Sequence, residues 1–494
     1  MIEKIRKMII DKKNILYLYC LLVTLIFFGG FCLLQFAPDT YSVFASDPLI
    51  IASHFGSCGR YVTQFLVFIS MHVLNLPHIV IYYLSYFLAL LCIVISISRV
   101  FNLMKDDVKN KYLCFILSVA MIINPFSIEL FMYIEKGIMT LAILLSVFAV
   151  EKVNTALKTE KFKPFVLAFI YMFIANCCYQ GVVGFFVVYS LVIILKNSKS
   201  FIKFLVNNLF VALIYGLSSG LNYLSIKIFF ANQRLGGSKV LSESIRKIID
   251  GIRFMLVETY NILPSYFFLI LCGLVVVLCI IMIFKKNNKL KFKVLNIIAI
   301  FYIIIISLFA TIAPQMIQNT DSIWFVARSS YPMVSIISVL IWYVFTNSKS
   351  NFKYDFSFSM ITICLLVVQL ICFTRLTVDN YIGNYEDRVL SEKIITVIND
   401  YESSTGNKVD NISIYSDKSI LYVYPWLKYS GDMNIRAYSV NWCFIKALEM
   451  YSGRSFNEVE NDMNLKKQFS NHDWNSFDKE QVVFHGNTVH ISIY

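Results

Sequence analysis

The chain has 494 residues, of which 58% are hydrophobic and 15% are charged, and its mean hydropathy is +0.66. This composition excludes an ordinary soluble globular protein and predicts a protein that crosses a membrane several times. The net charge of +13 does not indicate nucleic-acid binding, because the lysines cluster in short segments between apolar runs, a pattern that sets membrane topology.

The distribution of apolar runs divides the chain in two. Runs long enough to cross roughly 30 Å of hydrocarbon recur from Ile15 to Thr374, whereas the sequence from Arg375 to Tyr494 is polar and mixed. We therefore expect a transmembrane domain at 1–374, with an external loop at 37–78, and a small soluble domain at 375–494.

The first apolar run, Ile15 to Phe36, is long for a signal peptide and lacks a small-residue cleavage site, so it predicts the first membrane span. The basic residues that precede it are Lys4, Arg6, Lys7, Lys12 and Lys13. Their positive charge predicts a cytoplasmic N-terminus. The stretch SDPLIIASHFGSCGRYVTQF, residues 46–65, then lies outside the cell.

Further basic clusters constrain the number of crossings, because cytoplasmic clusters must be joined by even numbers of spans. These clusters are Arg99–Lys111, Lys152–Lys163, Lys196–Lys203, Lys285–Lys293, and Lys349 with Lys353. An odd number must join the first external loop to Arg99. This predicts a span at Ile79–Ser98 and a helix along the outer interface at Tyr61–Asn75, ended by Pro77.

The run Pro164–Leu195 has lysines on both sides and would be roughly 48 Å long as one helix. We therefore expect a hairpin with its turn at Ala175–Gly181. Irregular backbone at that depth implies a protein-lined cavity. The same parity argument, continued along the chain, predicts about eleven crossings and an extracytoplasmic C-terminus.

Two later segments have clear periodicity. Apolar residues recur at helical spacing in 245–256, with basic residues between them, which predicts an interfacial helix in the external loop 231–260. Its cations either meet lipid phosphates or only anchor the surface. In the soluble domain, 386–401 is helical in pattern, whereas 411–424 and 480–494 alternate like strands, the second around an HGN turn. A small α/β domain is expected.

Four ionisable residues flank or lie near the first external loop: Asp47, Arg60, Asp39 and His54. A carboxylate can deprotonate an acceptor hydroxyl, and an arginine can hold a phosphate through charge-assisted hydrogen bonds. The alternative is that all four are ordinary solvated loop residues. We favour that alternative for His54, for which no partner can be identified.

Further candidates lie where the chain turns back into the membrane. Glu129, Glu135 and Lys136 follow the Asn124–Pro125 corner, and ionisable groups at membrane depth usually have a partner or a function. A structural pair between Glu135 and Lys136 is an equally good interpretation.

Polar residues also occur at two other predicted span ends. Arg328, at the start of a late span, binds a phosphate or head group or merely anchors its helix. Tyr179 and Gln180, in the hairpin turn, bind a polar ligand or satisfy freed backbone groups. No Walker loop, HExxH or G-x-S-x-G motif occurs, and the 12 cysteines form no CxxC pair with matching histidines, so a zinc site is not expected.

Taken in chain order, these motifs resemble those of the serotype-converting (O-antigen) glucosyltransferases, Gtr type II, of the GT-C superfamily. The family's acidic pair corresponds to Ser46-Asp47, and its Gly-Arg to Gly59-Arg60. Its Asn-Pro with downstream Glu and Tyr corresponds to Asn124-Pro125 with Glu129 and Tyr133, and its Tyr-Gln to Tyr179-Gln180. Its late arginine corresponds to Arg328, and its Asp-Arg helix to the helix with Asp387-Arg388. The first acid of the family's pair is replaced by Ser46.

The resemblance implies a GT-C-like, polytopic α-helical enzyme of the bacterial plasma membrane. It would move glucose or a related hexose from a polyprenyl phosphate to a cell-surface glycan on the outer face, without a nucleotide or nucleic acid. The implied catalytic base is Asp47, with Asp39 as the alternative; the implied phosphate ligands are Arg60, Arg328 and Lys136; the implied substrate contacts are Glu129, Tyr133, Tyr179 and Gln180. No cofactor is expected, because Asp47 lacks a partner carboxylate for a divalent metal. The soluble tail would help to bind the acceptor.

Other functions remain open. A transporter or flippase of lipid-linked sugars would place charges deep inside the spans or repeat its two halves. A glycan polymerase or ligase shares the substrate class and is not separated by the sequence. A purely structural membrane protein leaves the polar turn at Tyr179 and the loop at Asp47 without a reason.

Overall fold

The computed structural model describes residues 12–230, 240–285, 290–316, 318–347, 352–416, 430–440, 442–472, 474 and 477–493. Five predicted features lie wholly or partly outside these residues: the basic N-terminal segment, the start of the 231–260 loop, the last two basic clusters, and the end of the strand-like 411–424 segment. The chain forms two compact units. The membrane unit comprises Met1–Cys32 and Ala52–Thr374, and the C-terminal unit comprises Leu33–Ile51 and Arg375–Tyr494.

The membrane unit is helical. Within the described residues, nine helical segments are long and apolar enough to cross a membrane: Asn14–Cys32, His78–Met104, Lys136–Thr159, Gln180–Asn197, Phe201–Phe229, Phe267–Lys285, Leu290–Met316, Ala327–Thr346 and Phe352–Thr405. Shorter apolar helices are Tyr61–Val73, Lys111–Ile122 and Lys163–Cys178. This architecture is compatible with the polytopic helical membrane protein that the composition predicts.

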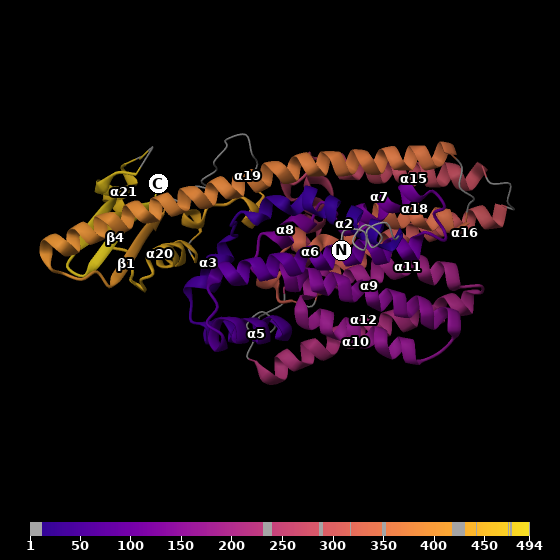
Figure 1. The fold of residues 1–494 in the computed structure, drawn as a ribbon, viewed down its shortest axis with the longest axis horizontal. Coiled ribbons are helices and arrows are strands. Elements are labelled where there is room, and N and C mark those ends of the chain that lie inside the picture. Colours follow the sequence, from indigo (N-terminus) through magenta and orange to yellow (C-terminus); the bar gives the residue numbers. More distant parts are fainter. Residues whose placement is uncertain are drawn as a thin grey trace, which may run out of the picture. The chain divides into compact units, whose positions relative to one another are not determined.

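The helices from the first half of the membrane unit lie side by side (Figure 1). They are α2 (Lys12–Phe28), α6 (His78–Met104), α7 (Lys111–Ile122), α9 (Lys136–Thr159), α10 (Lys163–Cys178), α11 (Gly184–Asn197) and α12 (Phe201–Phe229). Later helices of the unit are α15 (Phe267–Lys285), α16 (Leu290–Met316), α17 (Ala327–Val334), α18 (Ile336–Asn347) and the first part of α19 (Phe352–Thr405). α9 packs against α6 and α10, and most of its side chains are buried, Ile143 and Val150 among them.

The helices predicted on either side of Pro77 are both present. One consists of α5 (Tyr61–Val67) and the π-helical η2 (Phe68–Val73), and the other is α6, which Pro77 precedes with extended backbone. The break predicted within Pro164–Leu195 is present, because α10 and α11 are separate helices joined by a short 3-10 segment, η3 (Gln180–Val182). It begins at Tyr179, since residues 175–178 of the predicted turn are still helical. A long apolar run with basic ends is therefore divided into two helices, as the length argument requires.

The predicted amphipathic helix is also confirmed, as α14 (Leu241–Arg253) followed by the π-helical η4 (Phe254–Glu258). Its outer face exposes the apolar side chains of Leu241, Ile245 and Ile249, spaced four residues apart. On the inner face, Ser244 hydrogen-bonds the hydroxyl of Thr320 at 2.8 Å. The helix thus presents an apolar stripe away from the unit.

The C-terminal unit contains a four-stranded sheet in the order β2-β1-β4-β3. Its elements are α3 (Pro38–Ala45), β1 (Asn411–Ser416), α20 (Phe444–Ser452), β2 (Asn457–Glu458), α21 (Met463–Ser470), β3 (Val482–His485) and β4 (Thr488–Ile493). β1 runs parallel to β2 and β4, and β3 runs antiparallel to β4. The predicted HGN hairpin is confirmed, with His485 opposite Thr488 and Gly486 at φ +60° in the turn.

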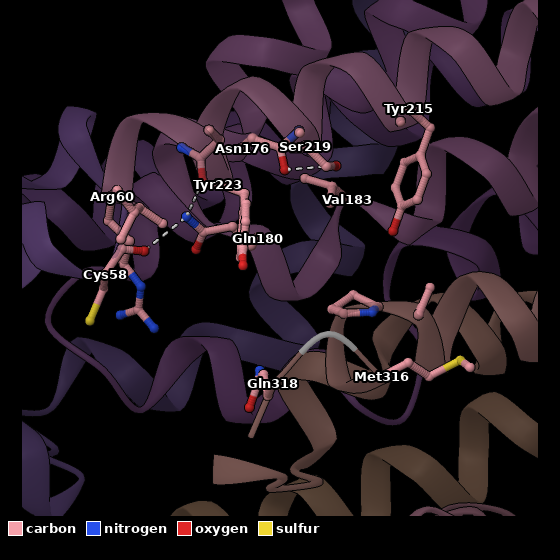
Figure 2. A pocket seen from close by; sticks show the side chains of 16 residues that line it. Cys58, Arg60, Asn176, Gln180, Val183, Tyr215, Ser219, Tyr223, Met316 and Gln318 are labelled. Atoms are coloured by element: carbon pink, nitrogen blue, oxygen red, sulfur yellow. Dashed lines mark hydrogen bonds between the residues drawn. The ribbon is translucent and has the colours of Figure 1, made fainter. Parts of the chain in front are cut away.

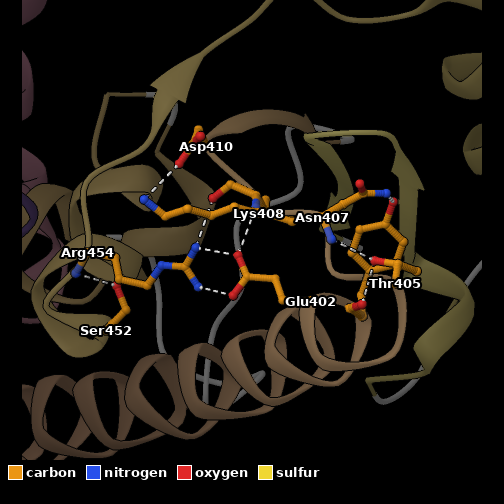
Figure 3. Close-up of polar contacts among 9 residues, drawn as sticks. Glu402, Thr405, Asn407, Lys408, Asp410, Ser452 and Arg454 are labelled. Carbon is orange, nitrogen blue, oxygen red and sulfur yellow. Dashed lines mark hydrogen bonds and ion pairs between the residues drawn. The ribbon is translucent and has the colours of Figure 1, made fainter.

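An ion pair fixes the end of α19 to the sheet (Figure 3). The Arg454 guanidinium donates to both oxygens of Glu402, at 2.7 and 3.1 Å, and to the carbonyl of Val409 at 2.8 Å. The same carboxylate accepts the backbone N–H of Val409 at 2.7 Å. This closed set of bonds holds the last turn of the helix against the start of β1 and the segment after α20.

Arg454→Ala should therefore loosen the C-terminal sheet. Losing a bidentate, half-buried ion pair and a carbonyl partner costs roughly 1–3 kcal/mol. We expect faster hydrogen exchange of the β1 and β4 amides in the full-length protein, measured by mass spectrometry. Lys408→Ala is the matched control, because Lys408 meets Asp410 at 3.4 Å with a side chain 78% exposed, and such pairs contribute little. Equal exchange in the two variants would contradict the assignment.

Candidate functional site

Polar residues of the membrane unit gather around Tyr179, which stands between η3 and the end of α10. This side chain is 4% exposed and interacts electrostatically with Arg60, Arg328, Glu129 and Glu135. These five residues come from four segments that are far apart in the sequence. The structure thus brings Arg60, Glu129, Tyr179 and Arg328 together with Glu135, for which the sequence left open a functional role or a structural pair with Lys136.

The centre of this cluster is the pairing of Arg328 with Glu129. Glu129 lies on the short helix α8 (Ser127–Phe131), and its carboxylate accepts the backbone N–H of Arg328 at 2.6 Å. The other carboxylate oxygen forms an ion pair with the Arg328 guanidinium. Arg328 begins α17, so the carboxylate also lies at the positive end of that helix. Only 3% of the Glu129 side chain is exposed, so the charge is compensated by these contacts rather than by water.

Arg328 is held from a second side by Tyr133. The guanidinium donates to the tyrosine hydroxyl and lies 4.2 Å from the centre of the ring. Cation–π contact and a hydrogen bond together restrict the side chain to one position. Tyr133 is itself buried, with 2% of its surface exposed.

The Asn124–Pro125 corner explains why α8 and α17 meet. The Asn124 amide donates to the carbonyl of Tyr331 and the hydroxyl of Ser335, both at 3.1 Å, and its oxygen accepts from Phe126 N at 3.1 Å. One buried side chain therefore fixes the turn before α8 and joins it to α17 and the start of α18. A polar residue in an apolar run, followed by proline, is the sequence signal for such a corner.

Arg60 forms the second cation of the site. Its guanidinium contacts Glu135 at 3.4 Å and lies 4.8 Å from the centre of the Tyr179 ring. The Nε atom of Arg60 is buried and has no hydrogen-bond partner among the described residues. An unpaired buried donor is costly and indicates that a ligand or water completes the site.

Gly59 sets the position of Arg60. Its φ of +72° is favoured only by glycine, and a Cβ atom there would lie 2.6 Å from Ile226 Cδ1 and 2.8 Å from the Asn222 oxygen. The Gly59 carbonyl accepts from the Asn222 amide at 2.9 Å. Glycine is thus required both by the backbone and by the close approach of α12.

Gln180 ties the hairpin turn to the same region. Its amide donates to the carbonyl of Cys58 at 3.0 Å and to the Asn222 oxygen at 3.1 Å. Asn222 is a contact of this region that was not predicted from the sequence. The available signal was an asparagine within the apolar helix α12, where a polar side chain is expected to have a partner.

Lys136 has a different environment from the two arginines. Its side chain is fully buried, and Nζ lies 3.6 Å from the centre of the Tyr82 ring and 6.0 Å from that of Phe31. No hydrogen bond to Nζ occurs among the described residues. A phosphate would reach this ammonium only after the surrounding helices had moved, so its contacts are those of a buried cation–π partner.

The two acids predicted as the base belong to the C-terminal unit. Asp47 is exposed, and its Oδ1 accepts the backbone N–H groups of Leu49 at 2.7 Å and Ile50 at 3.4 Å. Asp47 therefore caps α4 (Pro48–Ser57). Asp39, in the first turn of α3, accepts from the indole of Trp442 at 3.4 Å.

A cavity of about 660 Å³ adjoins Arg60 in the membrane unit. Figure 2 shows Arg60, Cys58 and Gln180 on one side and Tyr215 and Met316 on the other. The rest of the wall comes from α12, α16 and the hairpin turn: Asn176, Val183, Gly216, Ser219, Gly220, Asn222, Tyr223, Ile226, Ala313, Pro314 and Gln318. The α12 wall is partly open because a Cβ at Gly216 or Gly220 would meet no atom within 4 Å.

The donor set of the described residues does not form a metal site. Within those residues, no three His, Cys, Asp or Glu side chains are grouped to hold a metal ion. What the cluster offers instead is two arginines, each beside a carboxylate and a tyrosine ring. Such guanidinium groups are suited to oriented binding of an anion, phosphate in particular.

Glu129→Gln should destabilise the membrane unit strongly, by about 3 kcal/mol, because it leaves the largely buried Arg328 charge without a counter-charge. Glu135→Gln is the matched control and should cost less, since the contact of the Glu135 carboxylate with Arg60, at 3.4 Å, is longer than the pairing of Glu129 with Arg328. The measurement is the midpoint temperature for loss of the soluble species in detergent, followed by size-exclusion chromatography. Indistinguishable midpoints would show that Glu129 has no special structural role.

Comparison of the chain with protein-family models, curated proteins and solved structures gave no match. The chemistry of the site is therefore inferred from its own residues.

Proposed function

We propose that the chain is a membrane glycosyltransferase of the GT-C type, similar to the type II serotype-converting glucosyltransferases. It transfers a hexose, glucose or a close relative, from a polyprenyl-phosphate donor to a cell-surface glycan on the outer face of the bacterial plasma membrane. The observation that carries this proposal concerns Arg60. This residue lines the 660 Å³ cavity, and its buried Nε atom has no hydrogen-bond partner among the described residues.

The cavity supports an amphiphilic ligand. Arg60, Gln180 and Asn222 supply polar groups on its wall, whereas the surfaces contributed by α12 and α16 include Ile226, Ala313 and Met316. Ligand sites that combine mostly apolar walls with a few placed polar groups bind molecules of the same character. A lipid carrier with one phosphate has an anionic head for the guanidinium and an apolar chain for the rest.

Two arginines favour a phosphate over a neutral head group. Arg60 and Arg328 are each restrained by a carboxylate and a tyrosine ring, so both guanidinium groups are held in place before the ligand binds. Donors arranged in advance stabilise the charge that develops on a departing phosphate. In this mechanism Glu129, Tyr133, Tyr179 and Gln180 hold the arginines and the hairpin turn in position.

The number of apolar helices supports the proposed topology. Among the described residues, the nine long candidates would give eleven crossings together with the two shorter helices Lys111–Ile122 and Lys163–Cys178. The third short helix, Tyr61–Val73, then lies along the outer interface. With a cytoplasmic N-terminus, an odd number of crossings leaves the C-terminal unit outside the cell.

Asp47 is the proposed base. One of its oxygens caps α4, and the other has no hydrogen-bond partner among the described residues and can take a proton. The carboxylate removes the proton of the acceptor hydroxyl as the hydroxyl oxygen attacks the anomeric carbon. The bond from that carbon to the phosphate oxygen breaks, and the lipid phosphate leaves with the electron pair, stabilised by the arginines.

The test is transfer of radiolabelled hexose from a short-chain polyprenyl phosphate to cell-envelope glycan, in membranes that contain the full chain. Asp47→Asn should lower the rate by roughly 10²–10⁴-fold through loss of the base. Arg60→Gln should lower it by roughly 10²–10³-fold through loss of phosphate stabilisation. His54→Asn, an exposed change in the same helix α4, is the control and should leave the rate unchanged.

Two results would contradict this mechanism. If Asp47→Asn transfers sugar as fast as the native protein, the base is another group, and Asp39 is the next to replace. If native membranes transfer no sugar but move the lipid-linked sugar across the bilayer, the protein is a transporter. Transfer of a whole glycan in place of one hexose would identify a polymerase or ligase.

A further inference from the structure

The C-terminal unit exposes an indole ring at Trp442. This side chain is 62% exposed and stands between η8 (Ala437–Ser439) and α20. Trp342 in the membrane unit, by contrast, is fully buried. Leaving so large an apolar ring in water forfeits a substantial burial free energy, and exposed tryptophans are enriched where a partner or ligand covers them.

Asp39 stands directly beside the ring. Its Oδ1 accepts from the indole Nε1 at 3.4 Å, which orients the flat ring with respect to the carboxylate. The neighbouring residues are also joined, because the Cys443 thiol donates to the carbonyl of Pro38 at 3.1 Å. The hydrogen bonds from Trp442 to Asp39 and from Cys443 to Pro38 together fix the two segments relative to each other.

The elements that carry the two residues are packed on each other. α3 contacts α20, and the hydroxyls of Tyr41 and Tyr451 meet at 3.2 Å. Tyr41 is 1% exposed and Cys443 is fully buried, so the support beneath the pair is a packed core. The ring and the carboxylate are therefore presented by a rigid base, which lowers the entropic cost of binding.

The surroundings of the pair are acidic. The pKa of the Cys443 thiol is raised by burial and further by the nearby carboxylates of Asp387, Asp39 and Asp432. Asp387 is compensated by Arg436 at 2.7 Å, whereas Asp39 and Asp432 are both partly exposed. An acidic surface repels anionic lipid head groups and free phosphates.

A sugar ring has the complementary chemistry. One face of a pyranose carries C–H groups that lie flat on an aromatic ring, and its hydroxyls donate hydrogen bonds to a carboxylate. The sugar is neutral, so the acidic surroundings do not repel it. An exposed indole with a carboxylate at its edge thus matches a polyhydroxylated ring on both its apolar and its polar side.

We propose that Trp442 and Asp39 form a carbohydrate-binding subsite on the C-terminal unit, which receives a sugar residue of the acceptor glycan. This inference rests on the proposed function, because it assigns the acceptor of the same reaction. It gives Asp39 a role in binding the acceptor and leaves Asp47 as the base. Trp442 stacks on the sugar, and neither residue takes part in the bond-breaking step.

Direct binding tests the subsite without any transfer reaction. The full chain in phosphatidylcholine nanodiscs is applied to a printed array of several hundred neutral oligosaccharides. The native protein should bind a subset of them, and Trp442→Ala should weaken that binding at least tenfold. Trp442→Phe should retain part of it, because a ring remains, and Asp39→Asn should weaken it several-fold. Met463→Ala, 64% exposed on the same unit, is the control and should bind like the native protein.

The outcomes separate this proposal from the proposed function. If Trp442→Ala binds like the native protein, or if the native protein binds no oligosaccharide, the subsite does not exist, even where sugar transfer proceeds. If the native protein binds and the variant does not, the subsite stands, even where no transfer is found.

An exposed indole could instead anchor in the bilayer interface. Nanodiscs with brominated lipids distinguish this case. Quenching that is greater for the native protein than for Trp442→Phe would place the ring in lipid and overturn the proposal. Equal quenching in the two proteins is the expected result.

Discussion

A charged group in the apolar part of a membrane protein must be compensated, and the pair of Glu129 with Arg328 shows how this chain meets that constraint. The Glu129 carboxylate accepts a hydrogen bond from the backbone N–H of Arg328 and pairs with its guanidinium, so α8 is joined to the start of α17. Asn124 fixes the corner from which that short helix starts. Tyr133, Tyr179 and Arg60 then occupy positions around a fixed cation, and the cavity begins beside Arg60.

The same compensation affects ligand binding. A cation that is already paired with a carboxylate attracts an incoming anion less than a bare one, but it is stable in the empty site and needs no rearrangement. Arg60 and Arg328 differ in this respect. Arg328 is held by two carboxylate contacts and a tyrosine, whereas Arg60 makes one longer contact with its carboxylate and keeps an unpaired donor. Arg60 is therefore the cation more available to a ligand, and Arg328 the one more important for the fold.

The sequence was sufficient to predict elements whose signal is local. Apolar length, basic flanks and proline predicted α6, the α10–α11 hairpin and α14, and alternation around HGN predicted the β3–β4 hairpin. Contacts between side chains of different helices leave no such local pattern in the sequence. The Arg60–Glu135 contact and the burial of Lys136 against Tyr82 depend on which faces of separate helices meet.

The place of residues 33–51 was unpredictable for a similar reason. The backbone N–H of Phe36 donates a hydrogen bond to the side chain of Asn384, and the indole of Trp442 donates one to Asp39. The partners are 348 and 403 residues apart in the sequence. No local pattern encodes contacts so distant in sequence. An apolar run followed by a polar loop was therefore assigned to the transmembrane domain, whereas the structure places these residues in the C-terminal unit.

The glycines around the cavity bear on how this protein can change during evolution. Gly59 cannot be replaced without cost, because any side chain would strain the backbone and clash with side chains of α12. Gly216 and Gly220 are different, since alanine would fit at either position and each glycine in a helix interior costs about 1 kcal/mol relative to alanine. A narrower cavity is thus one base change away at two sites and would come with a more stable helix. Glycine at these two positions therefore keeps the cavity wide at a cost in helix stability.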